Sequence, residues 1–228
     1  GGLEKLRYLK EFPSCDSIRD ADVEAFVHAL SSLPLLEKLD FSTCLSNTEH
    51  VGQLYAAIGK LKYLRKLELG ILNTTINAEV EALAKVLPSL ELLEELILLW
   101  EEQEELDCEH KKPLLAAISK LRYLKKLNFN CYDLTGRGIY FEGLGEMLKS
   151  LWLLETLQLM RLECKNESEK KELLVSVGKL KYLKKLELWW EQITQTNVDD
   201  LAMTLTTLQV LEEFTLRVRF YCSHDCDD

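Results

Sequence analysis

Apolar residues recur along this chain in one repeated pattern, Leu-x-x-Leu-x-x-Leu-x-Leu. Its copies begin at Leu6, Leu33, Leu61, Leu90, Leu121, Leu151, Leu180 and Leu208, so successive copies start 27 to 31 residues apart. A near-constant period of about 20–50 residues is typical of a solenoid, in which similar units stack along one axis. Residues 1–228 are therefore predicted to form a single repeat domain.

Each repeat predicts a helix followed by a short strand. Val51, Leu54, Tyr55 and Ile58 precede the copy at Leu61 at spacings that place them on one face of a helix. The residues 67–69 that follow alternate between Leu and Glu, as in a strand with one buried face. No unit can cover its own apolar face, so neighbours must stack. The strands are predicted near residues 9–14, 36–41, 64–69, 93–98, 124–129, 154–159, 183–188 and 211–216.

These repeats resemble leucine-rich repeat proteins, and specifically the ribonuclease-inhibitor-like subtype with long helical repeats. The resemblance extends over essentially the whole chain. It implies an α/β solenoid of about eight repeats, shaped as a horseshoe, with a parallel sheet on the concave side and helices on the convex side.

One feature of that subtype is missing. Its members usually carry Asn or Cys three residues after the last Leu of the strand, where the side chains bond backbone groups in a ladder. The corresponding residues here are Ser17, Cys44, Leu72, Glu101, Tyr132, Leu162, Glu191 and Arg219. Only Cys44 fits, so we expect the ladder to be weak or displaced.

Basic and acidic repeats alternate. The copies at Leu6, Leu61, Leu121 and Leu180 carry Tyr at their third position, with Lys or Arg on either side. The copies between them carry Glu37, Glu94, Glu155 and Glu212 instead. We expect neighbouring repeats to pair these charges along one edge, each exposed pair contributing about 0–1 kcal/mol.

Composition narrows the classes of function. The chain is 47% hydrophobic with a formal charge of −10, which argues against disorder and against nucleic acid as a partner. No apolar run approaches the roughly 18 residues of a membrane-spanning helix, so no membrane association is expected. Neither end shows a polar capping repeat, which suggests a fragment of a longer chain.

Catalytic and metal chemistry is not indicated. The seven cysteines are scattered and odd in number, which favours a reducing compartment and a cytoplasmic location. The cluster Cys222, His224 and Cys226 lacks the second ligand pair of a zinc site, so we expect a polar tail with free thiols. Glu49-His50 and Glu109-His110 occupy equivalent repeat positions, as expected from repeat inheritance rather than from two catalytic pairs. We therefore predict no enzyme activity, no metal and no cofactor.

The outward side of the predicted sheet is the candidate binding surface. Strand alternation directs one set of side chains towards the concave solvent, and several of these are apolar where a solvated face should be polar. The predicted partner-binding residues are Ile97, Leu99, Asn128, Gln158, Met160, Glu187 and Trp189. In the alternative interpretation, Trp189 packs against Trp190 and the adjoining loop as part of the structure.

A second candidate is an acidic rim that follows the fourth strand. Glu101, Glu102, Glu104 and Glu105 are expected in the turn between strand and helix, either as a solvated loop or as a site that attracts a basic partner. Trp152 is also open to two interpretations, as an exposed residue or as a half-buried corner residue.

These features predict a non-catalytic protein-recognition module. The irregular repeat length and the missing ladder look most like the C-terminal ligand-sensing or autoinhibitory region of a NOD-like innate immune receptor. The alternative is a stand-alone cytosolic inhibitor or scaffold of the ribonuclease-inhibitor type that binds a basic client. Both rest on resemblance, because a fold does not determine a function.

Overall fold

The structure is a computed structural model of the chain. It describes residues 8–71, 76–102, 108–133, 139–140, 142–163, 166–190 and 193–218.

Helices and strands alternate along the described residues. The strands are β1 (Cys15–Arg19), β2 (Lys38–Cys44), β3 (Lys66–Ile71), β4 (Glu95–Glu102), β5 (Lys126–Asp133), β6 (Ile139–Tyr140), β7 (Thr156–Met160), β8 (Leu162–Glu163), β9 (Lys185–Trp190) and β10 (Glu213–Val218). The α-helices are α2 (Val23–Ser31), α3 (Thr48–Ile58), α4 (Ile76–Val86), α5 (Cys108–Ile118), α6 (Leu144–Leu148), α7 (Glu167–Val177) and α8 (Gln195–Thr207). Two 3-10 turns are η1 (Asp20–Asp22) and η2 (Leu87–Ser89).

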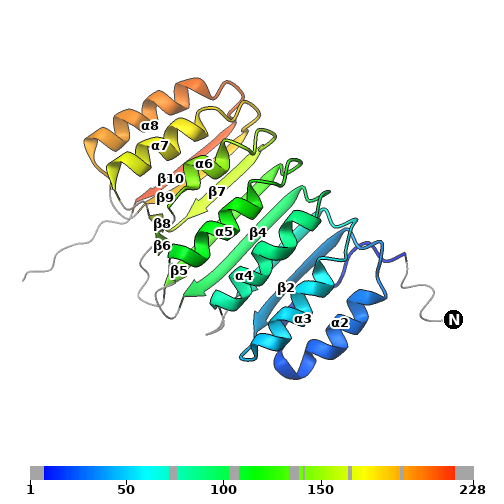
Figure 1. The fold of residues 1–228 in the computed structure, drawn as a ribbon. Coiled ribbons are helices and arrows are strands. Elements are labelled where there is room, and N and C mark those ends of the chain that lie inside the picture. The colour runs from blue at the N-terminus through cyan, green and yellow to red at the C-terminus, as the bar shows by residue number, and fades with distance from the viewer. Residues whose placement is uncertain are drawn as a thin grey trace, which may run out of the picture.

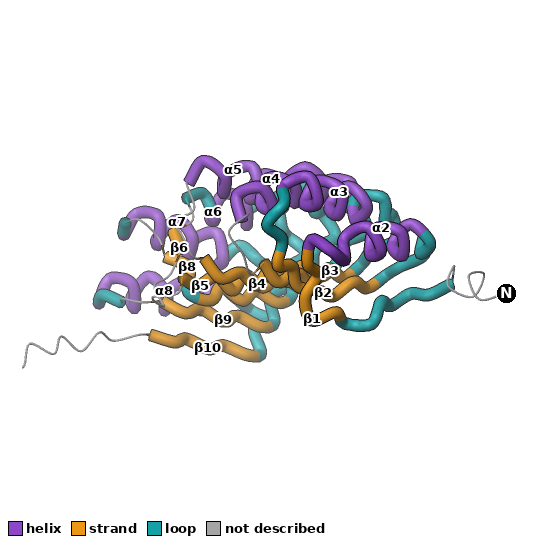
Figure 2. The backbone as a smooth tube through the Cα atoms, turned by 90° about the horizontal axis from the view of Figure 1, so that it is seen from below, coloured by secondary structure: helices purple, strands orange, loops and turns teal. Residues whose placement is uncertain are grey.

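Eight of the described strands form one open parallel sheet in the order β1-β2-β3-β4-β5-β7-β9-β10, and β6 pairs with β8 separately. The helices run side by side in one layer (Figure 1). Figure 2 shows this layer along the convex side of the sheet, with the opposite face uncovered. The predicted leucine-rich repeat solenoid, with a concave parallel sheet and convex helices, is therefore confirmed.

The repeated leucines fill the space between sheet and helices. Leu61, Leu64, Leu67 and Leu69 are all buried, as are the helix residues Val51, Leu54, Tyr55 and Ile58. Each such side chain contributes about 1.5–3 kcal/mol when removed from water. In the last described repeat, Phe214 takes the place of Leu67 and is 38% exposed, because no described strand covers its outer side.

The starts of the strands are displaced from the prediction by a constant amount. From β2 to β10, each strand of the large sheet begins two residues later than predicted. Before β3, a turn is closed by the Leu64 amide, which donates to the Leu61 carbonyl at 3.1 Å. The amides of Arg65 and Lys66 then both donate to the Glu37 carbonyl of the preceding repeat, at 2.7 and 2.9 Å, and the strand begins at Lys66.

The first strand was misplaced. Over the predicted range 9–14, Glu11 forms only an isolated bridge with Lys38, and β1 lies at Cys15–Arg19. Pro13 falls inside the predicted range, and a proline cannot donate to a strand ladder.

A buried polar cluster connects three repeats. Glu79, in α4, accepts hydrogen bonds from the hydroxyls of Thr43 at 2.8 Å and Tyr55 at 2.9 Å. All three residues are buried, and Thr43 also donates to the Gly70 carbonyl at 3.2 Å. Burial, followed by the nearby Glu79 carboxyl, raises the pKa of Tyr55 well above its ordinary value. The cluster thus bonds a backbone carbonyl from within the core, which is the task of the absent Asn or Cys ladder.

The repeat between β5 and β7 is irregular. Its helix α6 has 5 residues, where α3, α4, α5 and α7 have 11. The helix begins after Gly143, which has φ 90° and lies in the left-handed region that favours glycine. Gly145 brings α6 close to α7, since a Cβ there would lie 3.1 Å from a side-chain atom of Glu172.

Among the described helices, none is both long and apolar enough to cross a bilayer.

Tyr55→Phe is expected to lower the free energy of unfolding by about 1–3 kcal/mol, because a buried carboxyl group loses a hydroxyl donor. Urea denaturation provides the measurement. The matched control is Tyr63→Phe, which removes the hydroxyl of an exposed tyrosine and should leave stability unchanged. Equal effects at the two positions would contradict the role assigned to the buried cluster.

Gly143→Ala is expected to destabilise the fold by about 1–2 kcal/mol, since a side chain is strained in the left-handed conformation. Gly52→Ala serves as the comparison, because a Cβ at that position in α3 meets nothing within 4 Å. That substitution should stabilise the helix by up to about 1 kcal/mol. The idea fails if both variants shift the urea midpoint in the same direction.

Candidate functional site

The uncovered face of the sheet carries side chains in columns, because each strand pairs in register with the next. Glu68 lies beside Ile97, Ile97 beside Asn128, and Asn128 beside Gln158. Gln158 in turn pairs with Glu187. A second column contains Ser42, Gly70, Leu99, Asn130, Met160, Trp189 and Arg217. The predicted concave residues therefore do lie on one face, in two adjacent columns.

Trp189 is the centre of the most developed cluster on this face. Its side chain is half-buried, and two guanidinium groups lie over its ring: that of Arg161 at 4.5 Å from the ring centroid and that of Arg217 at 5.8 Å. Each is within cation–π range, where an attraction of about 0.5–2 kcal/mol is expected. The ring is therefore held in place by groups on either neighbouring strand segment, while part of its surface stays open to solvent.

A backbone irregularity puts Arg161 there. Arg161 directly follows β7 and has φ 57°, the only positive φ at a non-glycine residue in the described part of the chain. Its repeat position is one that Ile71 and Trp190 fill with buried apolar side chains. The left-handed turn frees the guanidinium from that inward position and lets it reach Trp189. An arginine at a position that holds Ile71, Trp190 and Val218 in other repeats was the signal that sequence reasoning missed.

Polar side chains surround the ring. Glu187 is only 9% exposed and accepts a hydrogen bond from Gln158 Nε2 at 2.8 Å. Arg217 forms an ion pair with Glu187 at 3.3 Å, so this arginine contacts both the ring and the carboxylate. Next in the column, Asn128 Oδ1 is buried and has no hydrogen-bond partner among the described residues. Trp190 follows on the strand but points into the core, so strand alternation separates it from Trp189.

The apolar residues predicted on this face differ in exposure. Ile97 is only 6% exposed between its column neighbours, so it offers a partner little surface. Leu99 and Met160 are half-buried, with Asn130 between them. The pairing of β7 with β9 ends at Leu159 and Leu188, one residue before Met160 and Trp189.

The acidic rim is only partly described. Glu101 and Glu102 lie within β4, paired with Tyr132 and Asp133, and not in the turn where they were expected. The strand is longer than predicted because its pairing with β5 continues past the repeat pattern. Glu104 and Glu105 lie outside the described residues.

The predicted alternation of charge is confirmed along the edge where the strands begin. Glu37 pairs with Lys10 at 2.8 Å, and Glu155 pairs with Lys184 at 2.6 Å. Between them, Glu94 pairs with both Arg65 and Lys125. Hydrogen bonds from Lys125, and then from Arg65, hold the pKa of Glu94 below its ordinary value of 4.5.

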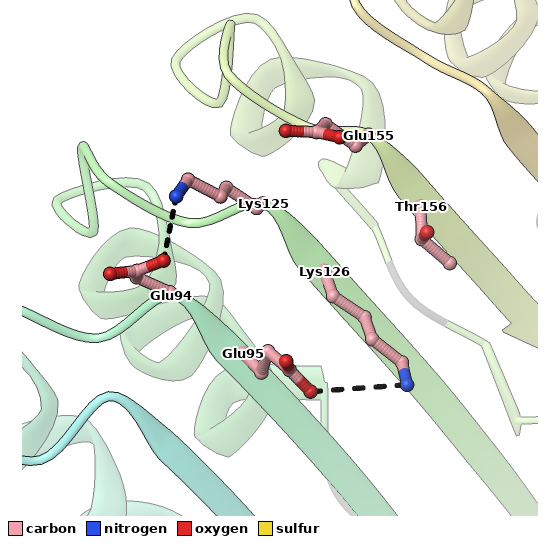
Figure 3. Close-up of a pocket in the computed structure, with 6 residues that line it drawn as sticks. All are labelled: Glu94, Glu95, Lys125, Lys126, Glu155 and Thr156. Atoms are coloured by element: carbon pink, nitrogen blue, oxygen red, sulfur yellow. Dashed lines mark hydrogen bonds and ion pairs between the residues drawn. The ribbon is translucent and has the colours of Figure 1, made fainter. Parts of the chain in front are cut away.

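A shallow pocket of about 230 Å³ lies within this row of charges (Figure 3). It is lined by Glu94, Glu95, Lys125, Lys126, Glu155 and Thr156. Figure 3 shows Lys125 bonded to Glu94 and Lys126 directed towards Glu95, at 2.7 and 3.9 Å. Ligand pockets are mostly apolar, whereas the chemistry here is that of ion pairs between repeats. We therefore regard the pocket as part of the charge row and not as a ligand site.

One histidine has an acidic partner. His50 Nδ1 lies 2.9 Å from Asp20 Oδ1, and Ser46 donates its amide and hydroxyl to Asp20 Oδ2 at 3.0 and 2.5 Å. The hydroxyl of Ser46, followed by His50, holds the pKa of Asp20 well below its usual range. A nucleophilic triad needs the histidine between serine and carboxylate. Here the Asp20 carboxylate lies between Ser46 and His50, and these contacts hold the loop before α3 against the preceding repeat.

Possible metal ligands were also compared among the cysteines, histidines and carboxylates. No group of three His, Cys, Asp or Glu in the described ranges could hold a metal ion. Cys15 and Cys44 are free thiols. Cys222, His224 and Cys226 lie outside the described residues.

Glu94→Gln is expected to lower stability at pH 7 by less than about 1 kcal/mol, because the pair is partly exposed. A carboxyl group whose folded pKa is depressed stabilises the fold above its unfolded pKa, and this contribution disappears as pH falls through the folded value. The difference from wild type should therefore shrink below pH 4.5. Urea denaturation at several pH values measures it, with the exposed neighbour Glu91→Gln as control. A difference that persists at pH 2 would contradict the ion pair as its source.

No protein-family model matches the chain, and no curated protein matches its sequence. Among solved structures, the chain is similar to the tropomodulin C-terminal domain from Caenorhabditis elegans, with 13% sequence identity and a TM-score of 0.44. The match covers 82% of this chain and 92% of that one. A similarity at this level assigns neither family nor function, so the fold assignment rests on the sheet, helices and repeat register described above.

Proposed function

We propose that this chain is a non-catalytic protein-recognition module whose concave face binds a protein ligand around Trp189. The observation that carries the proposal is a partly open indole ring fixed by two arginines on the uncovered face of the sheet. Trp and Arg are the residue types that most often dominate binding energy at protein interfaces. A ring that is already held in place loses little further conformational freedom when a partner binds.

The surroundings of Trp189 favour a particular kind of ligand. Arg161 and Arg217 supply positive charge beside the ring, while Met160 and Leu99 supply apolar surface in the same column. Glu187 is nearly buried and already bonded to Gln158, so it presents little negative charge to a partner. A ligand with an apolar side chain next to a carboxylate would complement this arrangement.

We propose the more specific role of ligand-sensing or autoinhibitory region of a NOD-like innate immune receptor in the cytoplasm. Its support is the resemblance in repeat length and in the missing side-chain ladder. An upstream nucleotide-binding domain in the full-length protein would be the decisive observation in its favour.

The alternative is a stand-alone inhibitor or scaffold with a basic client, which the overall charge of −10 favours. The two arginines at Trp189 do not match a basic client, so such a partner would need another surface. Glu101 and Glu102 at the end of β4 are the proposed residues for that contact.

Trp189→Ala is expected to weaken ligand binding by about 2 kcal/mol, or roughly 30-fold, as for a central interface residue. Peptides selected on the immobilised wild-type chain from a random displayed library serve as probes, and their affinities are measured by fluorescence anisotropy. The melting temperature should stay within a few degrees of wild type, because the ring is partly exposed.

The control is Met203→Ala, which removes another exposed apolar side chain but lies on the convex helix α8. It should change neither affinity nor stability. If the selected peptides bind Trp189→Ala undiminished, recognition lies elsewhere and the proposal is wrong. A large loss of melting temperature in Trp189→Ala would instead assign the ring to structural packing.

A further inference from the structure

The turns that lead from helix to strand carry a row of exposed aromatic rings. Tyr63, Tyr123 and Tyr182 precede β3, β5 and β9, and they are 52%, 56% and 52% exposed. Trp152, before β7, is 56% exposed. The strands of the large sheet all start at one edge, on the upper right in Figure 1, so these rings follow that edge. This surface is distinct from the concave face that contains Trp189.

Two cations precede each of these tyrosines. Lys60 and Lys62 lie three residues and one residue before Tyr63, and the other two tyrosines have basic residues at the same repeat positions. The six cations are all exposed: Lys60, Lys62, Lys120, Arg122, Lys179 and Lys181. The ion pairs found among the described residues involve other cations, such as Arg65 and Lys125. The edge is therefore basic and aromatic although the whole chain has a charge of −10.

The spacing along the edge is regular. One strand, β4, separates β3 from β5, and one strand, β7, separates β5 from β9. Two strand spacings amount to about 10 Å, so a tyrosine with its pair of cations recurs at that interval. In the repeat between Tyr63 and Tyr123, the positions of Lys60 and Lys62 are taken by Ser89 and Glu91. Positive charge is thus periodic and not continuous.

This periodicity selects among anionic partners. Nucleic acid and anionic lipid surfaces carry closely spaced negative charge, which would face Glu91 as well as Lys62. A polyproline II segment has three residues per turn and rises about 3.1 Å per residue, so one of its sides recurs every 9.3 Å or so. Its proline rings pack on exposed aromatic side chains, as in other grooves that bind proline-rich segments. An acidic residue at every third position would then face each pair of cations.

We propose that this edge, comprising Tyr63, Tyr123, Trp152, Tyr182 and the two cations that precede each tyrosine, binds an acidic, proline-rich segment of a partner protein in the polyproline II conformation. The carboxylates of the segment recur every third residue and pair with these cations. The prolines between them contact the aromatic rings. This interaction is separate from ligand recognition at Trp189, since it depends on other residues at another surface.

The test measures binding of a fluorescein-labelled peptide of five Glu-Pro-Pro repeats to the full chain, by fluorescence anisotropy at low salt. The combined reversal Lys62→Glu, Arg122→Glu and Lys181→Glu should weaken binding at least about tenfold. The matched control, Lys85→Glu, Lys112→Glu and Lys171→Glu, makes the same change in net charge on helices α4, α5 and α7. It should bind within about twofold of wild type.

The aromatic contribution is measured with Tyr63→Ser, Tyr123→Ser and Tyr182→Ser combined, which should weaken binding at least about fivefold. These rings are exposed, so the melting temperature should remain near that of wild type. A peptide of the same composition with its five glutamates in one run tests the spacing, and it should bind more weakly.

Four results would overturn the proposal. The first is that the Glu-Pro-Pro peptide does not bind, and the second is that the two peptides bind equally, which would reduce the effect to net charge. The third is that the helix control weakens binding as much as the edge reversal does. The fourth is that single-stranded oligo(dT) or phosphatidylserine vesicles bind the same edge more tightly than the peptide. Trp189→Ala should leave peptide binding intact, so a failure here is distinguishable from a failure of concave-face recognition.

Discussion

In-register parallel pairing is the constraint on which the rest of this structure depends. Each repeat stacks on the next with equivalent residues side by side. The residues at one repeat position therefore form a column across the sheet, in which neighbours are about 4.8 Å apart. Leucine columns make the core, as at Leu67 and Leu96. Alternating Glu and Lys make the charge row that includes Glu94 and Lys125. The same rule places Trp189 beside Arg217. The composition of the core, of the edge and of the concave face thus follows in each case from the same pairing register.

Sequence reasoning succeeded where a property repeats and failed where a single repeat departs from the pattern. The leucine period predicted the solenoid, the buried helix face and the identity of the concave columns, because eight copies reinforce one another. It could not predict that Pro13 displaces the first strand, or that the strands start two residues late, since turns and strands share the same leucine spacing. Arg161 depends on one left-handed residue, which no periodic pattern encodes. The low exposure of Ile97 likewise depends on its particular neighbours.

The position eleven residues before the first leucine of each repeat is polar throughout the chain. It holds Asp22, His50, Glu79, His110, Tyr140, Glu169 and Asn197. Where described, these polar side chains bond loops or neighbouring repeats: His50 contacts Asp20, Glu79 accepts from Thr43, and Asn197 donates to Glu167. These contacts are between side chains, and Asn197 Oδ1 in addition accepts a hydrogen bond from the Thr194 amide at 3.0 Å. Where they are described, polar side chains at this position thus link neighbouring parts of the solenoid from the helix side.

The short helix α6 has a mechanical consequence. A solenoid curves because helices need about 8–10 Å between axes while strands need only about 4.8 Å, so the helical layer must spread. With 5 residues in place of 11, α6 fills less of the helical layer. Helix packing therefore contributes less to the curvature of the sheet at this repeat than at the repeats with longer helices. We therefore expect the helical layer between β5 and β7 to resist bending less than the layer formed by the 11-residue helices. Bending at this repeat would alter the interval between Tyr123 and Tyr182 along the edge, and it would leave the pairing of Trp189 with Arg217 unchanged.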